Sequence, residues 1–302
     1  MSKKRAVTLR PYIQTRFAYE KLRVGSHCGH FTALWEEQCN ICGKGSLITV
    51  TQKATSNVKR SMRNEQLIAL LIGLIGIFVS QTFLQMILSA VAVILLVALL
   101  WFVQRRMLAS EIPLELERLF IQEQVNILED LKHNRKTAVA SLKEDELLTY
   151  EMLREISTLV QNDKIRLQQV VLLQSFVLRK DMDLTVEPLL IDGFDPDLAA
   201  YIGEIAKIKR DLIKNRSIRY ILAYEPYILE MEQGIDILTS VAGAAVRLKT
   251  YVETYPDFIR RYASRLPKDR FLRLYRIIRQ YPDHPWGKLA DEVAIIQKEL
   301  YE

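Results

Sequence analysis

The sequence predicts three parts in order: a small β module, a two-helix transmembrane hairpin and an all-α domain. Three observations lead to this prediction. All three cysteines lie in one short segment near the N-terminus, an almost unbroken apolar run follows, and helical periodicity dominates from Glu111 onward. The expected boundaries are 1–52 for the β module, 53–65 for a basic connector, 66–103 for the hairpin and 107–302 for the all-α domain.

The cysteines of the β module have the spacing of metal ligands. Cys39 and Cys42 form a Cys-x-x-Cys-Gly knuckle, in which two thiolates bind one ion and the glycine permits a tight turn. A tetrahedral ion needs two further ligands, so we expect Cys28 as the third and His30 as the fourth, with His27 as the alternative to His30. Thiols on the cytoplasmic face stay reduced, which favours a metal over a disulfide.

Residues 24–52 resemble a zinc ribbon, in which two knuckles on adjacent hairpins share one ion. The resemblance implies a closed site that holds a structural Zn²⁺; redox or catalytic thiols and a metal-free module are the alternatives. The sequence departs from the ribbon pattern at Gly25, which occupies the position of a cysteine. Strands are expected at 7–13, 17–24 and 46–51. The module has too few apolar residues to fold without a metal.

The apolar run is long enough to cross a bilayer core of about 30 Å twice, because one crossing needs about 20 helical residues. Polar residues at 80–82 and Gln85 interrupt it near its middle. We therefore expect spans at 66–83 and 86–103, joined by a turn that reaches the headgroups. One spanning helix at 86–103 after a re-entrant segment is the alternative.

Positive charge orients the hairpin. Lys59, Arg60 and Arg63 precede the first span, Arg105 and Arg106 follow the second, and the turn has no charge. Because cytoplasmic flanks carry the excess of basic residues, both termini are expected in the cytoplasm. The short connections and the lack of an extracytoplasmic domain favour the plasma membrane of a bacterium, with membrane lipids as partners.

Small residues recur on one face of the first span, at Ala69, Gly73, Gly76 and Ser80. In lipid, small residues allow two helices to approach closely. We interpret this face as packing against the second span, with self-association into a homo-oligomer as the alternative. A pore lining is disfavoured because neither span contains an ionisable residue.

Charge is distributed unevenly along the chain. Residues 1–64 carry 12 basic and three acidic residues, whereas residues 107–302 carry 28 basic and 32 acidic residues. Beside a membrane, the basic N-terminal part favours the anionic inner leaflet over nucleic acid as its partner. The helical pattern of the C-terminal part breaks at 192–197, where Asp195 or Asp197 is expected to cap a helix and where two lobes would divide.

One expected helix, at 268–280, carries arginines on the half opposite to its apolar face. A solvated charged face is the simplest interpretation, and docking to anionic lipid or an acidic partner is the functional one. The residues of this expected surface are Arg270, Arg273, Arg276 and Arg279.

The sequence contains no motif of an enzyme class: Gly-x-Ser-x-Gly and His-Glu-x-x-His are absent, and there are only four histidines. The pattern therefore favours a non-enzymatic membrane adaptor or scaffold, with a structural zinc site and a helical protein-interaction domain on the cytoplasmic face. An oligomeric membrane effector or channel, assembled through the hairpin, is the alternative. An enzyme whose site forms only in three dimensions is a third class, and the protein partners are not identified by the sequence.

Overall fold

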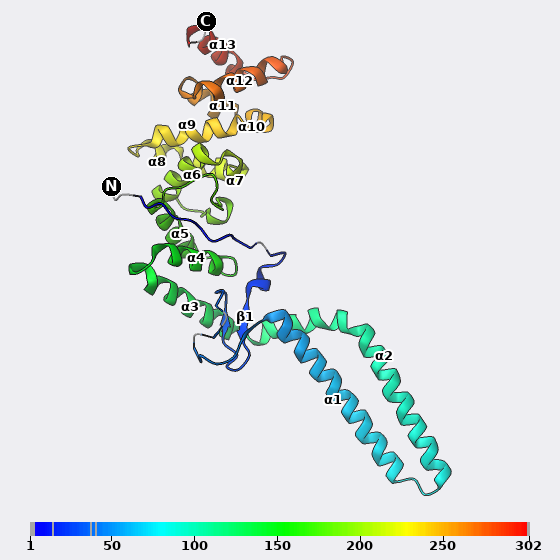
Figure 1. Cartoon of the computed structure of the whole chain (residues 1–302). Coiled ribbons are helices and arrows are strands. Elements are labelled where there is room, and N and C mark those ends of the chain that lie inside the picture. The colour runs from blue at the N-terminus through cyan, green and yellow to red at the C-terminus, as the bar shows by residue number, and fades with distance from the viewer. Residues whose placement is uncertain (1–3, 14, 37, 40, 301–302) are drawn as a thin grey trace. The chain divides into compact units, whose positions relative to one another are not determined.

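The structure is a computed structural model, and its chain divides into two compact units (Figure 1). The hairpin unit contains residues 14–139 and 158–160, and the helical unit contains residues 1–13, 140–157 and 161–302. The residues that the structure describes are 4–13, 15–36, 38–39 and 41–300.

The hairpin unit begins with a small antiparallel sheet. Its strands are β1 (Arg23–Gly25), β2 (Phe31–Thr32) and β3 (Leu47–Thr49), in the order β2-β1-β3. The predicted strand at 46–51 is thus present in its centre. The predicted strand at 17–24 is strand only at its end, because Ala18–Lys21 forms a 3₁₀ turn.

Two long helices follow, α1 (Val50–Phe78) and α2 (Phe83–Gln122). Thr49 starts α1 with a capping box, since its hydroxyl accepts a hydrogen bond from the amide of Gln52 at 3.2 Å. The expected connector at 53–65 is therefore the first part of α1. Both helices are long and apolar enough to cross a membrane by length and composition.

The turn of the hairpin lies at residues 79–82, slightly before the expected position. The hydroxyl of Thr82 accepts a hydrogen bond from the amide of Gln85 at 3.3 Å, which begins α2 at Phe83. At the open end of the hairpin, the side-chain amide of Gln66 donates to that of Gln104 at 2.7 Å. This pair joins the two helices at the limits of the apolar run.

The helix expected to begin near Glu111 is the C-terminal part of α2 instead, so Pro113 lies inside a helix rather than in a first turn. Proline lacks the amide proton of the helix ladder and its ring clashes with the preceding turn, which bends a helix. Figure 1 shows α2 bending after it leaves the hairpin. The next helix, α3 (Gln124–Ala140), follows after Glu123.

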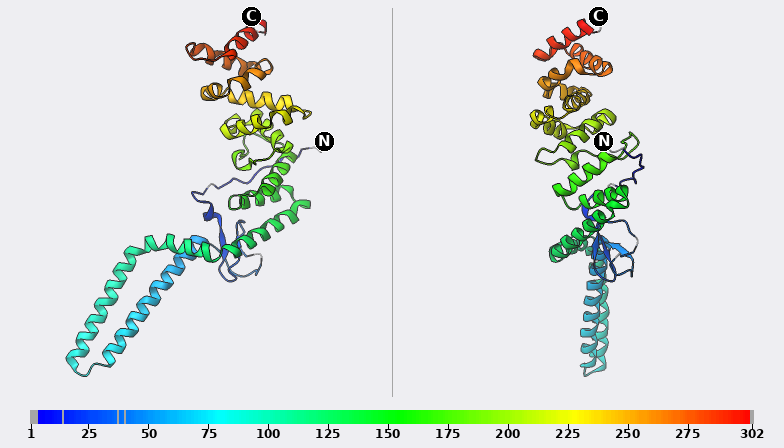
Figure 2. Two further views of the ribbon diagram at one scale, coloured as in Figure 1. Left: turned by 180° about the vertical axis from the view of Figure 1, so that it is seen from behind. Right: turned by 90° about the vertical axis from the view of Figure 1, so that its left-hand side faces the viewer.

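The helical unit is a stack in which the main helices pack in chain order. In this stack α4 packs on α5, α5 on α6, α6 on α9, α9 on α11, and α11 on α13 (Figures 1 and 2). The helices are α4 (Glu146–Ser157), α5 (Asp163–Ser175), α6 (Pro196–Ile208), α7 (Asn215–Ala223), α8 (Glu225–Leu229), α9 (Gly234–Ala245), α10 (Lys249–Thr254), α11 (Pro256–Tyr262), α12 (Lys268–Gln280) and α13 (Lys288–Leu300).

Within this stack α6 packs directly on α9, and Ile202 of α6 and Leu238 of α9 are completely buried. Gly203 permits the approach, because a Cβ atom at this position would lie 2.9 Å from Cγ1 of Ile237. The helix break at 192–197 lies inside this single unit. As predicted, Asp195 caps α6, its carboxylate accepting from the amide of Leu198 at 2.8 Å.

The segment 4–13, which we call the N-terminal strap, belongs to the helical unit and not to the sheet. The strand expected at 7–13 in the β module is therefore wrong. The strap is extended, and Arg5 forms a parallel β-bridge with Phe176, just after α5. The partner of the strap in this bridge therefore lies far away in the sequence and outside the sheet.

Candidate metal centre and charged surfaces

Two similar backbone turns carry the cysteines of the hairpin unit. In the second turn the amide of Gly43 donates to the carbonyl of Cys39 at 2.8 Å, and in the first the amide of Gly29 donates to the carbonyl of Gly25 at 2.9 Å. Gly29 and Gly43 have φ of 74° and 60°, which glycine adopts without strain. Cys28 and Cys42 each directly precede one of these glycines, so the two turns are equivalent knuckles.

The knuckles bring the three cysteines together. The sulfur atoms of Cys28, Cys39 and Cys42 all lie within 4.8 Å of one another, and those of Cys28 and Cys39 are 3.4 Å apart. Sulfurs about 2.3 Å from one tetrahedral ion lie about 3.8 Å apart, so the three thiols need shifts of at most about 1 Å in their separations to share one ion. Cys39 is buried, whereas Cys28 is exposed. The three residues could therefore hold a metal ion that is reachable from solvent.

The three thiols interact electrostatically. A backbone hydrogen bond at His30 lowers the pKa of Cys28, but desolvation and the neighbouring thiols outweigh it and leave that pKa raised. Burial raises the pKa of Cys39, but hydrogen bonds from the backbone at Cys42 and Ile41 and from the other thiols outweigh burial, so this pKa is lowered. Cys39 is thus the first of the pair to ionise. A bound cation would favour the thiolate form of all three.

The fourth corner of the cluster faces Gly25. A Cβ atom at Gly25 would lie 2.9 Å from the sulfur of Cys28 and 3.5 Å from that of Cys39. Gly25 also stands in the first knuckle where Cys39 stands in the second. The position from which a fourth cysteine would reach the ion is therefore occupied by a residue without a side chain.

The structure places neither candidate histidine in this cluster, within the part of the chain that it describes. His30 points instead to α3, where its Nδ1 lies 2.8 Å from the carboxylate of Asp130. The second oxygen of that carboxylate accepts from the amide of Phe31 at 2.8 Å. His27 is exposed. The geometry therefore gives Nδ1 of His30 a partner on α3, and among the described residues the structure groups only the three cysteines.

Side chains of α3 tie this helix to β2, and sequence reasoning did not identify them. The side-chain oxygen of Asn134 accepts from the hydroxyl of Thr32 at 2.9 Å and from the amide of Ala33 at 3.0 Å. Asp130 and Asn134 lie four residues apart, so both face the strand from one side of the helix. A cavity of about 240 Å³ lies beside them, lined in part by His30 and Cys39. The four-residue spacing of Asp130 and Asn134 is the sequence signal that could have identified this polar face of α3.

The small-residue face of α1 is used in part by the hairpin itself. At Gly73 a Cβ atom would lie 2.3 Å from Cγ2 of Val93 on α2, so only glycine fits. The hydroxyl of Ser80 lies 3.5 Å from that of Ser89. Gly76, in contrast, has nothing within 4 Å of its Cβ position. Ala69 is half-buried on the same helix.

The arginine helix is α12, and its apolar side chains Phe271 and Leu274 are buried as their spacing predicts. Its arginines do not form a single surface. Arg270, Arg273 and Arg276 line one pocket of the helical unit, whereas Arg279 stacks over the ring of Tyr275 at 5.5 Å.

No family model, no curated protein and no solved structure matches this chain. Its function must therefore be inferred from its own geometry.

Proposed function

We propose that this protein is a non-enzymatic membrane adaptor whose helical unit binds extended basic segments of other proteins at the cytoplasmic face of a membrane. The observation that carries the proposal is the N-terminal strap. It supports the proposal because the helical unit holds this segment of its own chain through backbone hydrogen bonds and charged side chains.

Backbone groups supply the first part of this recognition. The amide of Arg5 donates to the carbonyl of Ser175 at 2.8 Å, and the amide of Val177 donates back to the carbonyl of Arg5 at 2.8 Å. The amide of Tyr12 donates to the carboxylate of Asp183 at 3.1 Å. An extended partner segment of different sequence could form the same backbone bonds, as in strand addition to a sheet edge.

Charge supplies the second part. Lys4 pairs with Glu204 at 2.6 Å, and the amide of Arg10 donates to the carboxylate of Glu151 at 2.6 Å. Glu151 is buried, and the guanidinium of Arg154 donates to the carbonyl of Arg10 at 2.7 Å. Buried carboxylates are costly unless they are satisfied, so this surface favours a segment that brings amides and basic side chains to it.

The hairpin is the proposed membrane anchor. Its apolar side chains are exposed along both helices, which is favourable in lipid and unfavourable in water. An open pocket of about 740 Å³ at its base is lined by Lys59, Arg63, Arg105 and Trp101, among others. Basic and aromatic side chains at the limit of an apolar span suit anionic headgroups, and they support a cytoplasmic position for this end.

Zn²⁺ is the proposed ion of the cysteine cluster, because zinc accepts tetrahedral thiolate sites and needs no redox partner. The three thiolates would hold the ion and join the two knuckles, while water completes the tetrahedron at the corner of Gly25. Here the proposal departs from the expected ligand His30, since among the described residues only Cys28, Cys39 and Cys42 place their ligand atoms together in the structure. The ion would stabilise the small sheet, whose strands are two or three residues long.

A labelled peptide with the sequence of residues 4–13 tests the adaptor proposal. The partner in the assay is the chain without residues 1–13, purified in detergent and shown to be folded by circular dichroism. We expect saturable binding by fluorescence anisotropy. A control peptide with glutamate at Lys4, Arg5 and Arg10 should bind at least tenfold more weakly. Equal binding of both peptides, or none to the folded chain, would contradict the proposal.

One observation favours the alternative of an oligomeric effector or channel. The open position at Gly76 leaves part of the small-residue face of α1 free of the hairpin's own contacts. In lipid, such a face is able to pack against a second copy. The packing of Gly73 on Val93 accounts for the neighbouring part of that face, so we rank this function second.

A further inference from the structure

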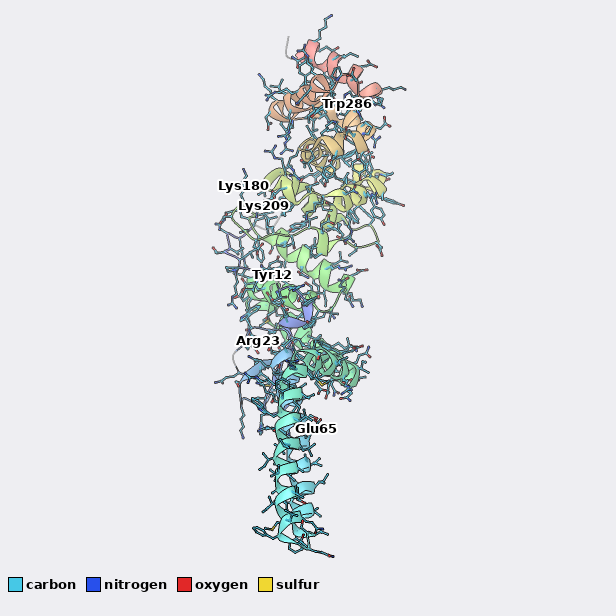
Figure 3. All side chains as sticks on the ribbon, turned by 90° about the vertical axis from the view of Figure 1, so that its right-hand side faces the viewer. Tyr12, Arg23, Glu65, Lys180, Lys209 and Trp286 are labelled. Atoms are coloured by element: carbon cyan, nitrogen blue, oxygen red, sulfur yellow. The ribbon has the colours of Figure 1, made fainter. Side chains whose placement is uncertain are left out.

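The helical unit contains a pocket of about 580 Å³ in which basic side chains from distant parts of the sequence meet. The segment after α5, the end of α6, the segment after α9 and the first turns of α12 all contribute. Figure 3 labels two of the contributors, Lys180 and Lys209, near one another at the edge of this unit. The basic residues of the lining are Lys180, Lys209, Arg210, Arg247, Arg270, Arg273 and Arg276, and its acidic residues are Asp211 and Asp269.

Arg270 is held in place at the inner wall of this pocket. Its guanidinium donates to the carbonyl of Ser240 at 3.3 Å, and its aliphatic chain lies against Gly243, where a Cβ atom would be 2.7 Å from Cδ. Desolvation, and then the nearby charge of Arg210, lower the pKa of Arg270. The charge of Asp269 opposes this shift but does not outweigh it, so the fold maintains a partly desolvated cation beside another cation, and a bound anion would stabilise both.

Two of the remaining cations are positioned by neutral acceptors. Arg273 donates to the carbonyl of Arg247 at 2.7 Å, and Lys209 donates to the carbonyl of Met182 at 2.7 Å. Within the described part of the chain, one ion pair joins two members of the lining, Arg210 and Asp269 at 3.9 Å. Both of its side chains are well exposed, so this pair neutralises little of the charge.

We propose that this pocket binds a compact polyanion that carries at least two linked phosphate groups. Its volume lies in the range of small-molecule sites, about 300–1,000 Å³. Guanidinium groups bind phosphate oxygens through pairs of parallel hydrogen bonds, and several converging arginines suit several phosphates. The site is separate from the acidic surface that holds the strap, and the proposal does not depend on the proposed adaptor function.

Calorimetric titration of the full-length chain in detergent with inorganic tripolyphosphate tests this inference. Sulfate at equal ionic strength controls for nonspecific attraction. We expect one saturable tripolyphosphate site per chain and at least tenfold weaker binding of sulfate. Sulfate that binds as tightly as tripolyphosphate would overturn the proposal.

Two arginines of α12 provide a matched pair of variants. Arg276 lines the pocket, Arg279 does not, and both are exposed, so either substitution should leave the fold intact. We expect Arg276→Glu to weaken tripolyphosphate binding by about tenfold or more, as the loss of a charge-assisted contact predicts. Arg279→Glu should change it less than twofold. An equal effect of the two variants would assign the binding to general surface charge and refute the site.

The phosphates could belong to a soluble molecule or to a lipid headgroup, and two further arms separate these sources. Vesicles that contain a lipid with a bisphosphorylated headgroup should compete with tripolyphosphate if the source is lipid. A nucleoside triphosphate should compete, and the vesicles should not, if the source is soluble. An acidic peptide without phosphate that displaces tripolyphosphate at lower concentration than either would overturn the assignment to phosphate.

Discussion

The corner of the metal centre at Gly25 allows the site to be completed by one substitution. In the variant Gly25→Cys, a Cβ atom 2.9 Å from the sulfur of Cys28 and 3.5 Å from that of Cys39 places a fourth thiol in the cluster. The contact with Cys28 is too short for an unchanged structure. Cys28 is exposed, so its side chain has room to move away from the new Cβ atom, and binding of an ion already requires the sulfurs of Cys28 and Cys39 to separate from 3.4 Å to about 3.8 Å.

The expected gain in affinity is large. Complete four-ligand zinc sites in small domains bind with about 10–16 kcal/mol, which is roughly 3 kcal/mol for each ligand. Replacing a water molecule by a thiolate should therefore tighten Zn²⁺ binding by roughly 100-fold, since 1.4 kcal/mol corresponds to a factor of ten. Serine at position 25 has nearly the same size as cysteine but is a poor zinc ligand, so Gly25→Ser should not increase the affinity.

Competition with a chromophoric chelator measures the affinity, and the spectrum of the cobalt-substituted protein counts the thiolates. We expect three thiolates in the original chain and four in Gly25→Cys. Small thiols added to the solution should change the cobalt spectrum of the original chain but not that of Gly25→Cys. A closed site in the original chain that becomes open in His30→Ala would show that His30 is the fourth ligand, and would refute our assignment of the Gly25 corner.

Two further predictions concern the hairpin and the helical core. Gly73→Leu should disrupt the contact with Val93 and separate α1 from α2, whereas Gly76→Leu should leave the hairpin intact. Cysteine crosslinking between the two helices measures this difference. Equal crosslinking in the two variants would contradict the packing described. Desolvation raises the pKa of the buried Tyr150 to about 12, whereas a tyrosine in the unfolded chain has a pKa near 10. Above pH 10 the unfolded chain therefore loses this proton more readily than the folded chain, which favours unfolding. The free energy of unfolding should fall by up to about 3 kcal/mol between pH 10 and pH 12, and urea denaturation should show a flatter pH dependence for Tyr150→Phe.

Local signals in the sequence predicted much of the helical unit. The cap at Asp195 and the buried face of α12 follow from rules that involve neighbouring residues only, and both are confirmed. The same rules missed α11, because a helix of seven residues that begins at Pro256 shows too few turns for its periodicity to be recognised. Residues 234–254 form two helices, because α9 ends at Ala245 and α10 begins at Lys249.

Features that depend on distant partners could not be predicted in this way. The close approach of three cysteines was foreseen from the spacing of knuckles, but the engagement of His30 by Asp130 brings together residues separated by the whole hairpin. The strap is the clearest case. Its sequence would allow it to pair with any exposed backbone edge, and only the folded chain shows that it pairs with the segment after α5.

The strap also imposes an order on the synthesis of the protein. Lys4 and Arg10 meet partners 200 and 141 residues later in the chain, and the hairpin is translated between them. At about 5–20 residues per second, the N-terminus waits roughly 7 to 40 s for its binding surface to leave the ribosome. The hairpin is therefore available for membrane insertion before the helical unit can close. During that interval the strap is an exposed basic peptide, and it can dock fully only after Glu204 has been synthesised.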